Sequence, residues 1–214
     1  MSLFKSLFGA VTSGATSQIG SGIGNSVASS AMNQAIDKGI KSVGNSIGNQ
    51  SKTYTFQTLP TSLEAFKALP EAQLKDVYAV AALSVLALTR YETSREECFA
   101  MLDFLKGPEP LTPTEKAQIN DRFMDGKTYK VKALFEGATP QNNYTPAQPY
   151  QIKVSSNPYS FENQNWANLY VHSGGADSPR PVRLRMKPST GQWFLVEIQY
   201  LGDIRIPVAQ DKWS

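Results

Sequence analysis

Residues 71–91, which read EAQLKDVYAVAALSVLALTRY, decide the fold of this chain. From Val77 to Thr89 the stretch carries no charge, and apolar side chains occupy every side of a helical projection. A helix that is apolar all round has to be buried on all sides. It is too short to cross a bilayer, which requires about 20 predominantly apolar residues. The stretch therefore predicts a helix at the centre of a folded core.

The composition around this helix fits one domain of ordinary size with an appendage. The chain has 214 residues, of which 41% are hydrophobic, and that content is enough to build one core. The net charge of +3 does not by itself require a nucleic acid partner. Cys98 is the single cysteine, so no internal disulfide can form, which is typical of a reducing compartment. The N-terminus shows no signal peptide pattern, so we expect a cytoplasmic protein.

Residues 1–50 differ from the rest and are expected to form a separate Gly/Ser/Asn-rich segment. They hold eight of the fifteen glycines, and each glycine in a helix costs roughly 1 kcal/mol relative to alanine. Apolar residues nevertheless recur at helical spacing, as at Phe4, Leu7, Phe8 and Val11. One interpretation is a self-association or membrane-surface segment, with peripheral contact at the inner face of the membrane. The other is a flexible leader that becomes ordered only on contact.

Residues 51–126 are predicted to be helical. Three pairs fit the capping box, in which a threonine and a glutamate satisfy each other's free backbone N–H groups: Thr61 with Glu64, Thr93 with Glu96, and Thr112 with Glu115. Pro113 suits the first position of a helix, and Gly107 suits a position just after one. These signals predict helices near 62–69, 71–91, 94–105 and 113–124.

From residue 127 the apolar period changes to two, which is typical of strands. Strands are expected near 129–135, 150–154, 169–172, 182–187, 193–201 and 204–208. The dipeptide Gly202-Asp203 is a hairpin signal between the last two. Because helices come first and strands follow, we expect one α+β domain over residues 51–214, with helices in 61–125 packed on a mostly antiparallel sheet in 127–210.

Few residues offer catalytic or metal chemistry. His172 is the single histidine, with Ser173 and Asp177 nearby in HSGGADSPRP, which suggests a hydrolase. Triads are recognised by geometry rather than by sequence adjacency, and no G-x-S-x-G motif is present, so nucleophilic catalysis is not favoured. With one histidine, one cysteine and no clustered carboxylates, we expect no metal and no cofactor.

A row of basic residues is the most suggestive feature of the predicted sheet. Arg183, Arg185 and Lys187 alternate along one strand, so they share one face. This face either binds an acidic partner, a phosphate or a nucleic acid, or is simply solvated or packed against the acidic helices. No aromatic residue interleaves with the row in sequence, so nucleic acid is not the expected partner.

Residues 54–214 resemble an uncharacterised family of bacterial domains of unknown function. The resemblance lies in the runs LKGPEPLTPTEKAQINDRF, FEGATPQNNYTPAQPYQIKV, SGGADSPRPVRLRMKPSTGQWFLVE and DIRIPVAQDKW. It implies a bacterial, cytoplasmic protein, and it implies no activity, cofactor or catalytic residue. Residues 1–50 lie outside the resemblance.

Two functional hypotheses follow from these patterns. The first is a non-enzymatic interaction module with a protein partner or self-association, in which residues 1–50 mediate the attachment. The second is a small-ligand or anion-binding domain, which could be an enzyme, using the polar loops and the basic strand. The ligand-binding candidates are Asn142, Asn143, Tyr144, His172, Asp177, Arg180 and Arg183. A concave pocket lined by Tyr144, Trp166 and the arginines would favour the second hypothesis.

Overall fold

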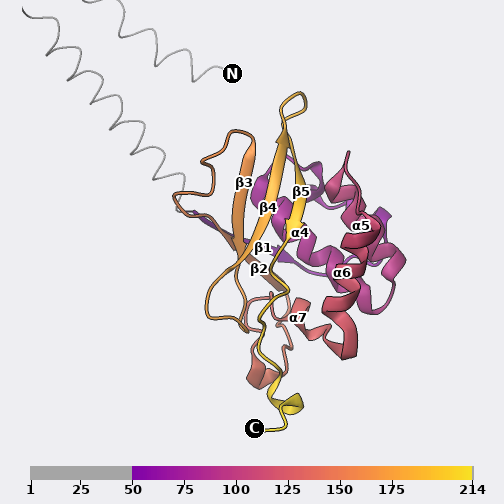
Figure 1. Cartoon of the computed structure of the whole chain (residues 1–214), viewed down its shortest axis with the longest axis vertical. Helices are drawn as coiled ribbons and strands as arrows, with labels where there is room; N and C mark the ends of the chain where they lie inside the picture. Colours follow the sequence, from indigo (N-terminus) through magenta and orange to yellow (C-terminus); the bar gives the residue numbers. More distant parts are fainter. Residues whose placement is uncertain (1–49, 214) are drawn as a thin grey trace, which may run out of the picture. The chain divides into compact units, whose positions relative to one another are not determined.

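A five-stranded antiparallel sheet forms the framework of the part of the chain that the structure describes, residues 50–213 of a computed structural model (Figure 1). Its strands are β1 (Ser51–Phe56), β2 (Tyr150–Ser155), β3 (Trp166–Val171), β4 (Arg180–Lys187) and β5 (Gln192–Ile198). They lie in the sheet in the order in which they occur in the sequence. β1 and β5 are therefore the two edge strands.

Five helices complete the described region, together with short 3-10 turns. The helices are α3 (Leu63–Lys67), α4 (Val77–Thr89), α5 (Arg95–Lys106), α6 (Pro113–Phe123) and α7 (Tyr129–Lys132). The α+β class predicted from the sequence is confirmed. The predictions for residues 1–49 lie outside the described region. Within residues 50–213, no helix is both long and apolar enough to cross a membrane.

Helix α4 is the centre of the core, as its composition predicted. All its residues from Val77 to Leu88 are buried, and it contacts all five strands. Cys98 of α5 is buried nearby, and burial raises the pKa of its thiol to about 12. The cysteine is thus a protonated core residue at neutral pH.

The predicted helix over 71–91 is wrong at its start, because the chain breaks before α4. A 3-10 turn (Pro70–Gln73) ends at Leu74, whose φ of 60° is left-handed. Asp76 then caps α4 by accepting a hydrogen bond from the Tyr78 N–H. The same carboxylate accepts from Lys52 Nζ and the Tyr54 hydroxyl of β1, each at 2.8 Å. The start of α4 therefore depends on a distant strand.

The three predicted capping boxes had different outcomes. Thr112 and Glu115 form the complete box at the start of α6. At α3 the cap is Ser62, one residue after the predicted Thr61, and its side chain accepts a hydrogen bond from the Ala65 N–H. At α5 the cap is Ser94, one residue after Thr93, and its side chain accepts from the Glu97 N–H. Serine is the somewhat better capping residue of each adjacent pair, and it forms the cap at both helices.

Two predicted strands are wrong, and one strand was missed. Residues 129–135 form α7 and a following turn, because residues 133–135 are all buried in succession and no longer alternate. Residues 204–207 pair with no strand, and a 3-10 turn (Val208–Gln210) follows them. The segment is tied to the loop after β3 by the bond from Arg205 N–H to the Gly175 carbonyl. β1 lies within the region predicted to be helical, where its pattern of exposed and polar residues gave no strand signal.

Candidate functional site

One face of the sheet is covered by helices, and the other face carries the polar side chains of β3 and β4. The inner residues Ala167, Leu169, Val171, Val182 and Leu184 are at most 1% exposed. Side chains alternate between faces along a strand, so the residues between them lie on the opposite face. In Figure 1, β3, β4 and β5 lie in front of α4, with this opposite face toward the viewer. We call it the open face.

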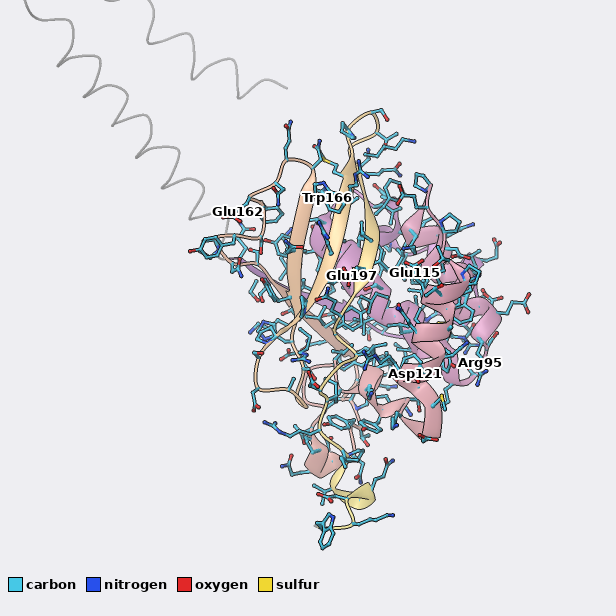
Figure 2. The ribbon with its side chains drawn as sticks, viewed as in Figure 1. Arg95, Glu115, Asp121, Glu162, Trp166 and Glu197 are labelled. Atoms are coloured by element: carbon cyan, nitrogen blue, oxygen red, sulfur yellow. The ribbon has the colours of Figure 1, made fainter. Side chains whose placement is uncertain are left out.

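The open face contains a cluster of one tryptophan and two arginines. Trp166 lies opposite Arg185 in the antiparallel ladder, and Asn168 lies opposite Arg183. The guanidinium carbons of Arg183 and Arg185 lie 4.5 and 5.1 Å from the centre of the indole ring. Trp166 is labelled at this position on β3 in Figure 2. We refer to Trp166, Arg183 and Arg185 as the arginine–tryptophan cluster.

The cluster corrects one premise of the sequence analysis. No aromatic residue interleaves with Arg183 and Arg185 along β4, but Trp166 of the neighbouring strand lies close to both guanidinium groups. The signal in the sequence is the period-two run WANLYV, which predicts a strand that begins at Trp166 and has Trp166, Asn168 and Tyr170 on one face. Only the pairing of β3 with β4 shows that this face is also the basic one.

Within the described region, the positive charges of the open face form no ion pair with a carboxylate. Among residues 50–213, no ion pair includes Lys153, Arg183, Arg185 or Lys187. Glu197 of β5 lies opposite Arg183 in the ladder, yet the two do not form an ion pair within this region. The cluster therefore presents two cations that are held by an aromatic ring and are available to an anion.

Polar residues continue the open face toward β2. The Tyr170 hydroxyl accepts a hydrogen bond from Asn157 Nδ2 at 2.9 Å. His172 Nε2 lies 3.1 Å from the Ser155 hydroxyl. Burial, and next the charge of Lys153, lower the pKa of His172 below its usual 6.5. The histidine is thus neutral at pH 7 and adds no charge to this face.

The histidine, serine and aspartate suggested by HSGGADSPRP do not form a triad. His172 is bonded to Ser155 rather than to Ser173. The Ser173 hydroxyl donates to the Ala133 carbonyl at 3.0 Å, and Asp177 forms an ion pair with Arg205. Each group has a structural partner of its own. Within the described region, no group of three or more His, Cys, Asp or Glu residues could hold a metal ion.

Four of the seven candidate site residues bind the C-terminal segment, residues 202–209. Asn143 Oδ1 accepts from the Ala209 N–H at 3.2 Å, and the buried Tyr144 donates to the Arg205 carbonyl at 2.7 Å. Arg180 donates to the Gly202 carbonyl at 2.7 Å and to Asp203 Oδ2 at 2.9 Å. Asp177 is the fourth, through its ion pair with Arg205. These side chains hold the end of the domain in place.

The other three candidates lie in two different places. Asn142 stabilises its own loop, since Oδ1 accepts from the Thr139 N–H and Nδ2 donates to the Gly137 carbonyl. His172 and Arg183 belong to the open face. A pocket of about 280 Å³ takes in Asn143 and Tyr144 but none of the other five. The structure thus does not bring the seven residues together. Trp166 and Arg185 were named in the sequence analysis, the first as a pocket-lining residue and the second in the basic row, but they were not among the seven candidates.

A groove of about 570 Å³ lies between α6 and the outer edge of β5. It is lined by apolar side chains such as Leu111, Ile119 and Leu195, and by the ion pair of Lys106 with Glu115 at 2.8 Å. Glu115 and Glu197, which both line it, are labelled in Figure 2. Lys106 is only 7% exposed and also donates to the Val196 carbonyl at 3.0 Å. This lysine therefore joins the helices to the edge of the sheet.

Comparison with known proteins identifies the family. A family model described as a domain of unknown function (DUF6935) matches residues 58–208, which is well over half of the chain. No match was found among curated proteins or among solved structures. The family assignment agrees with the resemblance to an uncharacterised family, and it carries no stated activity. The chain belongs to this family of domains of unknown function.

Proposed function

We propose that this protein is a non-enzymatic interaction module that binds an acidic segment of a partner protein on its open face. The observation that carries the proposal is the arginine–tryptophan cluster. Its two guanidinium groups lie over one indole ring and have no carboxylate partner among residues 50–213. Arg183 and Arg185 are exposed among the described residues, and the face belongs to the family-matched region.

The geometry of the cluster favours carboxylates as ligands. A guanidinium group binds a carboxylate through two parallel hydrogen bonds, and stacking on an aromatic ring keeps its plane oriented before binding. Less side-chain entropy is then lost when the complex forms. Arg183 and Arg185 therefore act as two prepared anchors rather than as freely rotating surface charges.

The spacing of the anchors favours an extended partner. Arg183 and Arg185 are two residues apart on β4, which corresponds to about 6.8 Å along the strand. An extended peptide repeats its side chains on one face at the same interval, so acidic residues at alternate positions match both arginines. Base stacking is less favoured, because two guanidinium groups already lie over the indole ring.

We further propose that residues 1–50 attach the module to its surroundings, by self-association or at a membrane surface. The support is the apolar stripe at helical spacing in a segment rich in glycine, serine and asparagine. The basic face and the attachment segment then have separate tasks, recognition and localisation.

The experiment compares charge-reversed variants for binding to a labelled peptide of alternating Glu and Ser. Fluorescence anisotropy should show that Arg183→Glu and Arg185→Glu each weaken binding by roughly tenfold or more, as expected for a lost charged hydrogen bond. Arg95→Glu is the matched control, because Arg95 also lies over an aromatic ring, 5.0 Å from that of Tyr91, but on α5 among the helices (Figure 2).

Three outcomes would contradict the proposal. The first is equal loss of binding in Arg95→Glu, since the effect would then follow net charge alone. The second is tighter binding of a single-stranded oligothymidine than of the peptide, which would indicate a nucleic acid partner. The third is binding of inorganic phosphate but not of the peptide, which would support the anion-binding hypothesis instead.

A further inference from the structure

The two edges of the sheet differ in how they are protected. At β5, the Trp193 N–H donates to the Leu74 carbonyl at 2.8 Å, and the Val196 carbonyl accepts from Lys106. An irregularity in the ladder between Arg183 and Leu184 also distorts this edge. Such coverings and bulges are how proteins prevent an edge strand from pairing with another chain. The β5 edge is therefore closed.

The β1 edge has no comparable covering among residues 50–213. The Gln50 carbonyl accepts from the Ser156 N–H, so Gln50 and Ser156 form a hydrogen-bonded pair between the two chain segments. In an antiparallel ladder every second pair is hydrogen-bonded, so the next such pairs between β1 and β2 involve Lys52 and Tyr54. Lys52 and Tyr54 then bond toward β2, while Thr53 and Thr55 direct their backbone groups outward. The residues opposite Thr53 and Thr55 on β2 are Lys153 and Gln151, and their carbonyls accept from the N–H groups of His172 and Glu136. These carbonyls therefore point away from β1, which agrees with the assignment.

The side chains of β1 also leave the edge accessible. Residues 51–53 and Thr55 are exposed, and the strand contains neither proline nor a bulge. Lys52 is the one charged residue, and its ammonium is bound to Asp76 at 2.8 Å and lies 4.8 Å from the centre of the Tyr78 ring. The charge is thus turned toward α4 instead of repelling a strand that approaches the edge.

We propose that β1 is a self-association surface, on which β1 of a second copy of this chain pairs antiparallel about a two-fold axis at Thr53. In this register Thr53 lies opposite Thr53 of the second copy, and Ser51 lies opposite Thr55. All three outward-directed residues form hydrogen-bonded pairs, which gives about six backbone hydrogen bonds. A symmetric dimer uses the same patch on both copies, so the patch has to be self-complementary.

The sequence SKTYT is self-complementary about its central threonine. On one face, hydroxyl side chains meet hydroxyl side chains, Ser51 against Thr55 and Thr53 against Thr53, and such cross-strand pairs are favourable. On the other face, Lys52 lies opposite Tyr54, so no like charges are opposed. A register shifted so that Lys52 opposes Lys52 would place two cations together. The symmetric register avoids that repulsion.

Chain connectivity favours a second copy as the occupant. Residues 1–49 lie directly before β1, so any self-association of that segment would bring two β1 edges to high local concentration. The two-fold axis runs perpendicular to the sheet, which places both open faces on the same side of one ten-stranded sheet.

Cysteine cross-linking in the full chain tests the register. Thr53→Cys should form a disulfide-linked dimer under mild oxidation, because the Cα atoms of a hydrogen-bonded antiparallel pair are about 5.5 Å apart, within the range of a disulfide. Thr55→Cys is the matched control. Its two copies would lie four residues apart along the strands, about 14 Å, and should not cross-link. The native Cys98 is buried and does not compete.

A proline variant tests the same surface without a cross-link. Thr53→Pro removes an outward N–H and leaves the bonds to β2 intact, so light scattering should show the dimer dissociation constant raised by roughly tenfold or more. Thr53→Val keeps the N–H and should remain dimeric, and circular dichroism confirms folding of both. Equal cross-linking of Thr53→Cys and Thr55→Cys, no cross-linking of Thr53→Cys, or an unchanged dimer in Thr53→Pro would overturn the proposal. A β1 edge covered by the chain's own N-terminal segment would give the second of these results.

Discussion

A hydroxyl pair in the core gives the sharpest test of the packing around α4. Ser84 of α4 and Tyr200, which follows β5, are both 0% exposed, and their oxygens lie 2.8 Å apart. The Ser84 hydroxyl donates its proton to the Ala81 carbonyl at 2.7 Å. Tyr200 must therefore be the donor to Ser84. The two single variants should for this reason have different effects.

The structure sets the expected free energies of unfolding. Tyr200→Phe removes one hydrogen bond but leaves Ser84 bonded to Ala81, so we expect a loss of about 0.5–1.5 kcal/mol. Ser84→Ala leaves a buried tyrosine hydroxyl without its acceptor, which costs about 1–3 kcal/mol. The higher helix propensity of alanine offsets about 0.5 kcal/mol of that loss. The double variant leaves neither group unpaired, so its loss should be smaller than the sum by about 1 kcal/mol or more.

Urea denaturation of the four proteins at pH 7 measures this coupling. The comparison holds where the dependence of the free energy on urea concentration is the same in all four. Losses that add to within about 0.3 kcal/mol would refute the reasoning, because independent sites behave in that way. A Tyr200→Phe loss that exceeds the Ser84→Ala loss by more than about 1 kcal/mol would show that the donor is assigned the wrong way round, because the expected ranges do not allow it.

Two further predictions concern pH and the N-terminal segment. The pKa of His172 is lower in the folded than in the unfolded protein, so the folded state binds fewer protons as the pH falls. The neutral histidine therefore contributes its full stability above about pH 6.5, and this contribution is lost as the pH falls below that value. Melting curves of His172→Gln should thus depend less on pH between 7.5 and 5.5, and an equal slope would contradict the assignment. Deletion of residues 1–49 should preserve the melting temperature, while sedimentation with liposomes or larger assembly is lost. An unfolded truncation, or a full-length chain that neither binds liposomes nor associates, would contradict the attachment role.

The candidate site could be only partly predicted from the sequence. Alternation along β4 was enough to place Arg183 and Arg185 on one face, because the direction of side chains on a strand depends on local geometry. The position of Trp166 beside them could not be predicted in this way, because it depends on the pairing of β3 with β4. Asn143, Tyr144 and Arg180 were predicted as ligand-binding residues from the sequence. Their contacts to residues 202–209, some 22 to 66 positions away, could not be predicted because they exist only in the folded chain.

The sequence by itself determined the features that depend on neighbouring residues. These are the burial of α4, which follows from its uniform apolar composition, the capping box of Thr112 with Glu115, and the α+β class. The tertiary structure decided the rest. It made β1 a strand through six pairs with β2, and it started α4 at Val77 because Asp76 is bound to Lys52 and Tyr54. Period and composition are local properties, whereas the ladder and the carboxylate network join residues whose proximity exists only once the chain has folded.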